Sequence, residues 1–183
     1  MATALKKLGY AEFLKFPDDG NRHEIIEGEW FMTPPPNLGH QGTVGNADRL
    51  LGNHIEKKDL GWLFVAPAAV FLGKHDIVEP DLFFVAKERR SILRKDGVHG
   101  APDLVIEVLS PSTAMYDRNE KLALYQRSGV REYWLVDPSE RTVEIREFGR
   151  VRRMRAYKEG QSFTSALLPG LTIRVDDLFK RLP

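Results

Sequence analysis

The chain has 183 residues, a length that suits one domain, residues 1–183, with a hydrophobic core of its own. Its 27 Lys and Arg residues nearly balance 26 Asp and Glu residues, so the net charge is +1. This net charge argues neither for nor against binding of nucleic acid, and only local clusters of charge can indicate it. The chain has no cysteine and no apolar run long enough to cross a bilayer, which excludes disulfides, thiolate metal sites and cysteine nucleophiles. We therefore expect a cytoplasmic protein without a membrane partner.

The first part of the chain predicts a short helix, a hairpin and a long helix. Residues Tyr10–Phe16 form the expected short helix, which the turn Pro17–Gly20 ends. Two strand-like segments around a glycine, Arg22–Glu27 and Glu29–Thr33, predict an N-terminal β-hairpin. After three prolines, apolar residues at helical spacing predict a helix over Gly39–Lys57.

The middle of the chain predicts short strands and one helix. We expect strands over Trp62–Ala66, Ala69–Leu72, Val78–Val85 and Leu104–Leu109. The charged segment between the last two, Lys87–Gly100, is expected to be irregular or partly helical. The Leu104–Leu109 run is apolar on both faces, which is typical of a buried central strand. A helix over Met115–Ser128 leads to a strand over Glu132–Val136, and this unit predicts two parallel strands.

The last part of the chain predicts a hairpin, a short strand and a terminal helix. The hairpin joins Thr142–Phe148 to Val151–Lys158, the strand covers Thr172–Val175 and the helix covers Asp176–Leu182. Together the elements predict an α/β fold, in which helices pack on a mixed central β-sheet.

Two carboxylates interrupt apolar, strand-like runs. Asp81 follows Pro80 at the start of one run, and Glu107 lies in the middle of another. A buried acid is costly unless it is paired, and carboxylate oxygens are the ligands that hard divalent cations take. Either acid alone is more often a turn cap or the partner of an arginine. Two of them on neighbouring strands favour a metal-dependent hydrolase.

The helix after the second run carries further candidates. Asp117, Lys121 and Tyr125 are spaced i, i+4 and i+8 and therefore share one face. A lysine beside a metal-bound carboxylate positions or deprotonates an attacking water, or neutralises phosphate charge. The alternative for Lys121 is a solvated ion pair with Asp117, which contributes little. Glu24, in the first hairpin, is a third candidate ligand of a metal or a water, with simple exposure as its alternative.

Polar residues elsewhere point to phosphate more weakly. His40 and Gln41 begin the long helix, where a helix N-terminus favours phosphate, and the alternative is local hydrogen bonding at the cap. Basic residues gather in two clusters that could contact a phosphodiester backbone, although acids interrupt both and such stretches are usually solvated surface. The clusters are Lys87, Arg89, Arg90, Arg94 and Lys95, and then Arg141, Arg146, Arg150, Arg152, Arg153 and Arg155.

The sequence resembles the PD-(D/E)XK nuclease superfamily and, within it, the Uma-type (Uma-two) restriction-endonuclease-like bacterial proteins. The resemblance rests on Pro80-Asp81 followed by Glu107-Val108-Leu109 and on the segments 23–29, 34–36, 40–41, 79–82, 100–113, 117–125 and 129–138. It implies a restriction-endonuclease-like core, hydrolysis of DNA phosphodiester bonds with Mg²⁺ (Mn²⁺ as a substitute) and a homodimer. It also implies that Asp81, Glu107 and the carbonyl of Val108 hold the metal.

One position departs from the superfamily pattern. The usual motif has a lysine two residues after the second acid, where this chain has Leu109, and the resemblance implies that Lys121 of the following helix supplies the amine. The leading interpretation is a Mg²⁺-dependent endonuclease in which Lys121 aids the attacking water and Glu24 assists, while Gln41 and Tyr125 contact substrate. The alternatives are a nuclease fold without cleavage that binds DNA or assembles, and a hydrolase of another phosphate ester.

Overall fold

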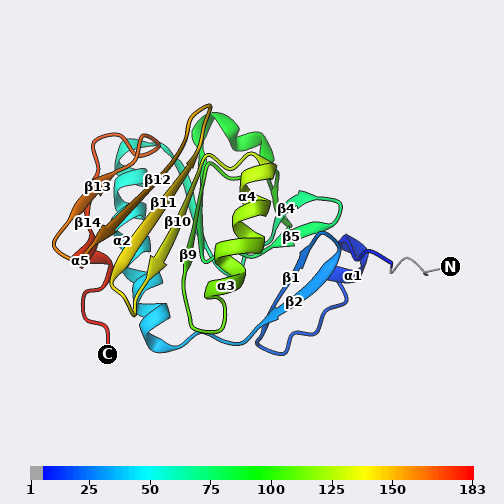
Figure 1. Ribbon diagram of the computed structural model, residues 1–183. Helices are drawn as coiled ribbons and strands as arrows, with labels where there is room; N and C mark the ends of the chain where they lie inside the picture. The colour runs from blue at the N-terminus through cyan, green and yellow to red at the C-terminus, as the bar shows by residue number, and fades with distance from the viewer. Residues whose placement is uncertain (1–5) are drawn as a thin grey trace.

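The computed structural model of the protein describes residues 6–183, so the first five residues of the expected domain lie outside it. Two six-stranded sheets form the body of the molecule (Figure 1). The central sheet has the order β12-β11-β10-β9-β6-β3, and the N-terminal sheet has the order β2-β1-β5-β4-β8-β7. This arrangement confirms the predicted α/β fold with a mixed central sheet, while the expected N-terminal hairpin is part of a second six-stranded sheet that the sequence does not predict.

The strands of the central sheet are β3 (Gly61–Val65), β6 (Leu82–Ala86), β9 (Leu104–Val108), β10 (Glu132–Asp137), β11 (Thr142–Phe148) and β12 (Arg152–Lys158). Those of the N-terminal sheet are β1 (Arg22–Ile26), β2 (Glu29–Thr33), β4 (Val70–Gly73), β5 (Asp76–Val78), β7 (Leu93–Arg94) and β8 (Gly97–His99). A separate pair joins β13 (Ser162–Thr164) to β14 (Thr172–Arg174). Strands β9 and β10 run parallel, as the sequence predicts.

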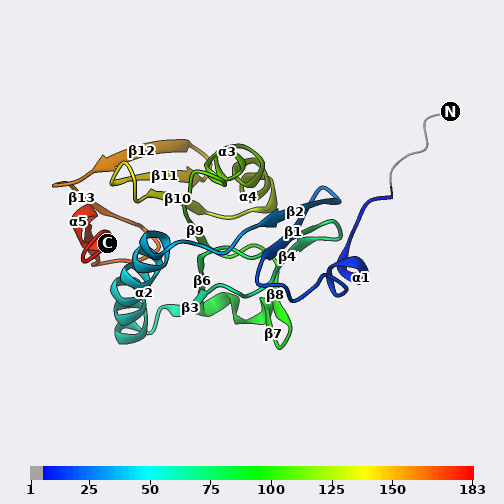
Figure 2. The ribbon, with the colours of Figure 1, turned by 90° about the horizontal axis from the view of Figure 1, so that it is seen from below.

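The helices are α1 (Tyr10–Phe13), α2 (Leu38–Lys58), α3 (Ala114–Tyr116), α4 (Leu122–Ser128) and α5 (Val175–Leu178), with a 3₁₀ helix over Lys87–Ile92 and a π-helical turn over Asp117–Lys121. Helices α2 and α4 lie on opposite sides of the central sheet (Figure 2). Among residues 6–183, the structure has no helix with the length and apolar character needed to cross a membrane.

The middle of the central sheet is buried on both faces, since β6 is apolar throughout and β9 is apolar except for Glu107. On one face, Leu82 and Phe84 of β6 pack with the apolar stripe of α2. On the other face, Phe83 and Val85 pack with α4, which contributes Leu124. Successive side chains of a strand point to opposite faces, so a strand buried on both sides needs this uninterrupted apolar run.

The expected single strand over Val78–Val85 is wrong, since the structure divides it between the two sheets. Strand β5 ends at Val78 and pairs with β1 and β4, whereas β6 begins at Leu82 and pairs with β3 and β9. Pro80 explains the break, because it has no N–H for a ladder and it restricts the backbone of the residue before it. The break places Asp81 between the two sheets.

Other expected elements differ in detail from the observed ones. The charged segment over Lys87–Gly100 contains the 3₁₀ helix and the β7–β8 hairpin, and the helix expected over Met115–Ser128 is α3, the π-helical turn and α4 in succession. The helix expected over Asp176–Leu182 begins one residue earlier and ends at Leu178. Strand β13 was not predicted, because three residues give no readable alternation.

Asp103 joins three parts of the central sheet just before β9. Its side chain is fully buried and accepts the backbone N–H of Ala86, at the end of β6, at 2.9 Å. Its other carboxylate oxygen lies 3.2 Å from both Arg89 and Arg131. This carboxylate therefore ties the 3₁₀ helix and the segment before β10 to the edge where β6 and β9 meet.

Replacing Asp103 by Asn should destabilise the protein by about 2 kcal/mol, because hydrogen bonds to a charged group contribute about that much. Urea unfolding followed by circular dichroism measures the change. The matched control is Asp96→Asn. The contacts of Asp96 with Tyr10 and His99 lie at the surface, so this substitution should lower the free energy of unfolding by less than about 0.5 kcal/mol. An Asp103→Asn variant as stable as the control would contradict the assignment.

Candidate active site

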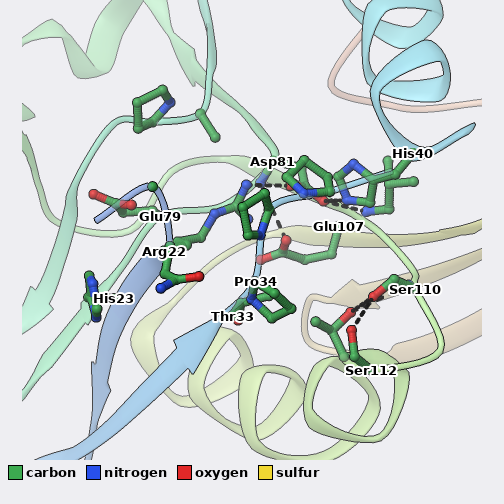
Figure 3. Close-up of a pocket in the computed structure, with 18 of the residues that line it drawn as sticks. Arg22, His23, Thr33, Pro34, His40, Glu79, Asp81, Glu107, Ser110 and Ser112 are labelled. Atoms are coloured by element: carbon green, nitrogen blue, oxygen red, sulfur yellow. Dashed lines mark hydrogen bonds and ion pairs between the residues drawn. The ribbon is translucent and has the colours of Figure 1, made fainter. Parts of the chain in front are cut away.

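The candidate site lies where the two sheets separate, in a cavity of about 670 Å³. Elements far apart in the sequence supply its polar side chains, and Figure 3 shows Arg22, His40, Asp81 and Glu107 converging there. Asp81 comes from the break between β5 and β6, and Glu107 from the end of β9. The structure thus brings together the two acids that the sequence predicts.

Glu107 lies on the face of β9 that α4 covers, and it is only 2% exposed. Its Oε1 accepts hydrogen bonds from the Lys121 ammonium at 2.9 Å and from the Tyr125 hydroxyl at 2.8 Å. Its Oε2 accepts the backbone N–H of Asp81 at 3.3 Å. The expected shared face of Lys121 and Tyr125 is therefore confirmed, and both contact the same carboxylate oxygen.

Lys121 is the cation at the centre of three buried carboxylates. Its Nζ lies 2.9 Å from Glu107, 3.0 Å from Glu24 and 3.8 Å from Asp117, and its side chain is 3% exposed. The two surface alternatives, a solvated Lys121 pair and an exposed Glu24, are wrong because all four groups are buried. The π-helical turn over Asp117–Lys121 widens the helix at this point, and such turns recur at functional sites.

Asp81 is held by Arg22, which the sequence analysis does not single out, and by His40 and Val108 in roles other than those expected for them. Arg22 donates to its Oδ1 at 2.8 Å, and the ring of His40 lies 3.0 Å from its Oδ2. The backbone N–H of Val108 donates to the same Oδ2 at 2.8 Å, which links Asp81 to the strand of Glu107. Alternation offered one signal for Arg22, since it shares a face of β1 with Glu24.

At the start of α2, a backbone N–H takes part in capping the helix and side chains reach the site. The backbone N–H of His40 donates to the side chain of Asn37, so the local capping alternative is confirmed for the backbone, while the His40 ring reaches Asp81. Gln41 lies on the wall of the cavity and its side chain is exposed. Val108 also lines the cavity, beside Asp81.

The site holds more negative than positive charge. The carboxyl groups of Glu24, Asp81, Glu107 and Asp117 are all buried, and the permanent cations among them are Arg22 and Lys121. With all four acids ionised, two negative charges would remain uncompensated. Bringing such charge out of water is costly, so the carboxyls either keep protons or gain a further cation.

The pKa values of the two central acids move in opposite directions. Burial raises the pKa of the Glu107 carboxyl to about 8, against the attraction of Lys121 and with the help of Asp81 and the other acids. Burial also opposes ionisation of Asp81, but the His40 hydrogen bond and the Arg22 charge outweigh it and hold the pKa of Asp81 well below its usual range. Asp81 is therefore the fixed anion, and Glu107 the group that exchanges a proton.

Burial and neighbouring charges also shift the pKa values of Asp117 and Lys121. Burial raises the pKa of Asp117 to about 6, with Lys121 opposing the rise. For Lys121, burial favours the neutral amine, but the charges of Glu107, Glu24 and Asp117 prevail and raise its pKa well above the ordinary value. Lys121 is therefore a permanent cation at neutral pH and cannot deprotonate a water.

The donor chemistry of the site suits a hard divalent cation. Carboxylate oxygens are the ligands such ions prefer, and Oε2 of Glu24 is buried without a hydrogen-bond partner. Within residues 6–183, no group of three or more Asp, Glu or His side chains already has metal-binding geometry. Arg22 and His40 account for this at Asp81, since they contact the oxygens that a metal would take.

The raised pKa of Glu107 predicts that stability falls as pH rises from about 6 to 8. In the unfolded chain this carboxyl ionises near pH 4.5, so over this range the folded state keeps a proton that the unfolded state has lost. Stability is therefore greater at the acidic end, by on the order of 2 kcal/mol. Urea unfolding in chelator at both pH values measures the loss.

Glu107→Gln cannot ionise at this position and should remove most of that pH dependence. The control is Glu56→Gln on the exposed side of α2, which should keep the slope of the wild type. Equal slopes in the wild type and Glu107→Gln would show that another group titrates.

Comparisons with known proteins give the chain a family. The Uma2 family model, described as "Putative restriction endonuclease", matches residues 10–176. An uncharacterized protein from Synechocystis sp. is 27% identical over 140 residues, 75% of this chain and 78% of the relative. A crystal structure of "a putative nuclease belonging to DUF820" from Anabaena variabilis has a TM-score of 0.78 at 22% identity, covering 94% of this chain and 97% of that one, which shows the shared fold. Because the family model spans nearly the whole chain, the protein belongs to the Uma2 family.

Proposed function

We propose that the protein is a metal-dependent DNA endonuclease whose reaction takes place in the cavity around Asp81 and Glu107. One observation carries the proposal: a buried lysine ammonium joins Glu24 and Glu107 beside Asp81, with an excess of carboxylates. A structural ion pair needs no such excess. Clustered groups whose pKa values are driven apart are typical of catalytic sites.

The carboxylates of Glu24, Asp81 and Glu107, with the carbonyl of Val108, are the groups that would hold Mg²⁺ or Mn²⁺. When bound, such an ion polarises a phosphodiester and lowers the pKa of a coordinated water. Arg22 and His40 contact the Asp81 oxygens that the ion would use. The guanidinium of Arg22 has a planar fork that matches the oxygens of a phosphate, so Arg22 would contact the substrate from this side of the site.

The chain's own residues divide the remaining tasks. Lys121 stays protonated, so it orients the attacking water through its N–H donors and stabilises negative charge that develops on the phosphate. Glu24 has a buried oxygen without a partner, which can accept a proton of that water. The Tyr125 hydroxyl fixes the orientation of Glu107 from the side of α4.

The wild type should cut both supercoiled plasmid and circular single-stranded DNA with Mg²⁺ or Mn²⁺. Asp81→Asn, Glu107→Gln and Lys121→Ala should each slow cutting by about 100-fold or more, because each removes a group that stabilises the transition state. Gel electrophoresis of timed reactions measures the rates, with Glu56→Gln as a control that retains activity. Equal cutting by the wild type, Glu107→Gln and Lys121→Ala would exclude this mechanism.

Metal binding should also be visible without cleavage. At about 100 times its dissociation constant, an ion that binds only the folded state adds about 2.7 kcal/mol to the free energy of unfolding. We expect Mg²⁺ or Mn²⁺ to produce such a gain over NaCl of equal ionic strength, in thermal or urea unfolding. Asp81→Asn should abolish the gain and Glu56→Gln should keep it. A gain that Asp81→Asn retains would place the ion elsewhere.

The second candidate is a nuclease fold that binds DNA or assembles without cutting. The observation in its favour is that Arg22, His40 and the N–H of Val108 already engage both oxygens of Asp81. In that case, DNA binding resists chelator and is the same in Asp81→Asn as in the wild type. The cutting and unfolding experiments above therefore separate the two candidates.

A further inference from the structure

The carboxylates of the site are buried beneath a cavity that is partly open to solvent. Asp81 and Glu107 are each only 2% exposed, although both line the cavity. Its walls include residues 16–21 before β1, residues 33–37 from the end of β2 to the start of α2, residues 65–67 at the end of β3, and residues 110–113 after β9. Figure 3 shows Pro34 on one side of Glu107 and Ser110 with Ser112 on another. A phosphodiester must pass between these walls to reach the acids.

A base-paired duplex fits this cavity poorly. Its phosphates lie on a rigid helix whose grooves alone are about 12 and 6 Å wide, and it cannot narrow to enter a pocket. The cavity volume of about 670 Å³ falls in the range of small-ligand sites, roughly 300–1,000 Å³. The backbone of an unpaired strand is single and flexible, so it can bend into such a space.

The cavity offers few free cations to the phosphates of either DNA form, so stacking on bases must supply much of the recognition. Binding through phosphates depends on Lys and Arg contacts for duplexes and single strands alike. Among the cavity-lining residues, Arg22 and Lys121 are the Lys and Arg side chains, and both are held by the buried acids. The register of the central sheet places the arginines of the β11–β12 turn at the opposite end of β10 from the cavity, because Glu132 pairs with Glu147 while Val136 pairs with Val108.

An aromatic cluster adjoins the cavity. The rings of Phe16 and Trp30 are stacked at 5.4 Å and 22°, and those of His23 and Trp30 at 5.7 Å and 26°. Phe16 and His23 line the cavity, and Trp30 is 51% exposed. Trp30 donates to Nδ1 of His23, so Nε2 of that ring carries the proton and donates to Asp19. These contacts hold the three rings in a fixed arrangement beside the cavity.

We propose that the substrate is an unpaired DNA strand, whose bases stack on Phe16 and Trp30, held from below by the buried His23, while its backbone enters the cavity. Stacking on aromatic side chains is how proteins bind single strands of any sequence, since every base has a π-face. This inference rests on the proposed nuclease function for its reaction, but recognition of the strand can be measured separately.

The first measurement is DNA binding by the protein, followed by fluorescence anisotropy. The probes are a labelled single strand of about 12 nucleotides and the same sequence paired in a hairpin duplex. With Ca²⁺ in place of Mg²⁺, the single strand should bind at least about tenfold more tightly. Phe16→Leu removes a ring but keeps an apolar side chain, and it should weaken single-strand binding by about tenfold. Phe148→Leu makes the same change at the far end of β11, outside the cavity, and should bind as the wild type does.

Trp30→Leu provides a second test. Trp30 is half-exposed, so the fold should tolerate this substitution more readily, and the variant should also bind the single strand more weakly. Circular dichroism checks that each variant is folded. Equal affinity for the two DNA forms would overturn the proposal. So would single-strand binding that both aromatic substitutions leave unchanged.

The second measurement is cutting of the same two DNAs with Mg²⁺ or Mn²⁺, which we expect to favour the single strand by at least about tenfold. Selective binding of the single strand without any cutting would support the recognition inference and refute the endonuclease. Cutting of both forms at equal rates, with loss of activity in Glu107→Gln, would support the endonuclease and refute the inference about the unpaired strand.

Discussion

The contact of the Lys121 ammonium with Glu24 and Glu107 is the interaction on which the site depends. It joins β1 of the N-terminal sheet, β9 of the central sheet and the helix that follows β9. A buried cation without these acids, or these acids without the cation, would be severely destabilising. The position of the two sheets at this point is therefore coupled to the charge of the cluster, and the same ion pairs that hold the fold together also hold the candidate catalytic groups.

The cluster differs from an ordinary structural ion-pair network because it lacks enough positive charge to balance its buried carboxylates. Natural proteins rarely bury more carboxylates than the cations available to pair with them, because each uncompensated charge costs free energy. Here Asp81 stays ionised through Arg22 and His40, while Glu107 keeps a proton. A divalent cation would remove the imbalance and let Glu107 ionise. Stability lost in building the cluster is then recovered in binding the ion that the proposed reaction needs.

The sequence predicts the parts of the site that follow from local periodicity. The apolar run around Glu107 marks a strand buried on both faces, and the spacing of Lys121 and Tyr125 places both on the helix face that packs against it. Contacts between distant elements are different. The Arg22 and His40 contacts to Asp81 depend on how the N-terminal sheet and α2 meet the central sheet, and no local spacing encodes that. The strand break at Pro80 was readable, but the apolar residues on both sides of it outweighed the proline in the prediction.

The departure at Leu109 has a physical explanation in the packing of β9. A residue two positions after Glu107 points to the same face of the strand, so a lysine there would lie under α4. Leu109 is instead 5% exposed within the apolar cluster that includes Leu124 and Tyr125. Lys121 approaches Glu107 from the helix that covers this same face, and its amine lies 2.9 Å from the carboxylate. The same amine lies 3.0 Å from Glu24, so the lysine links the acids of two sheets.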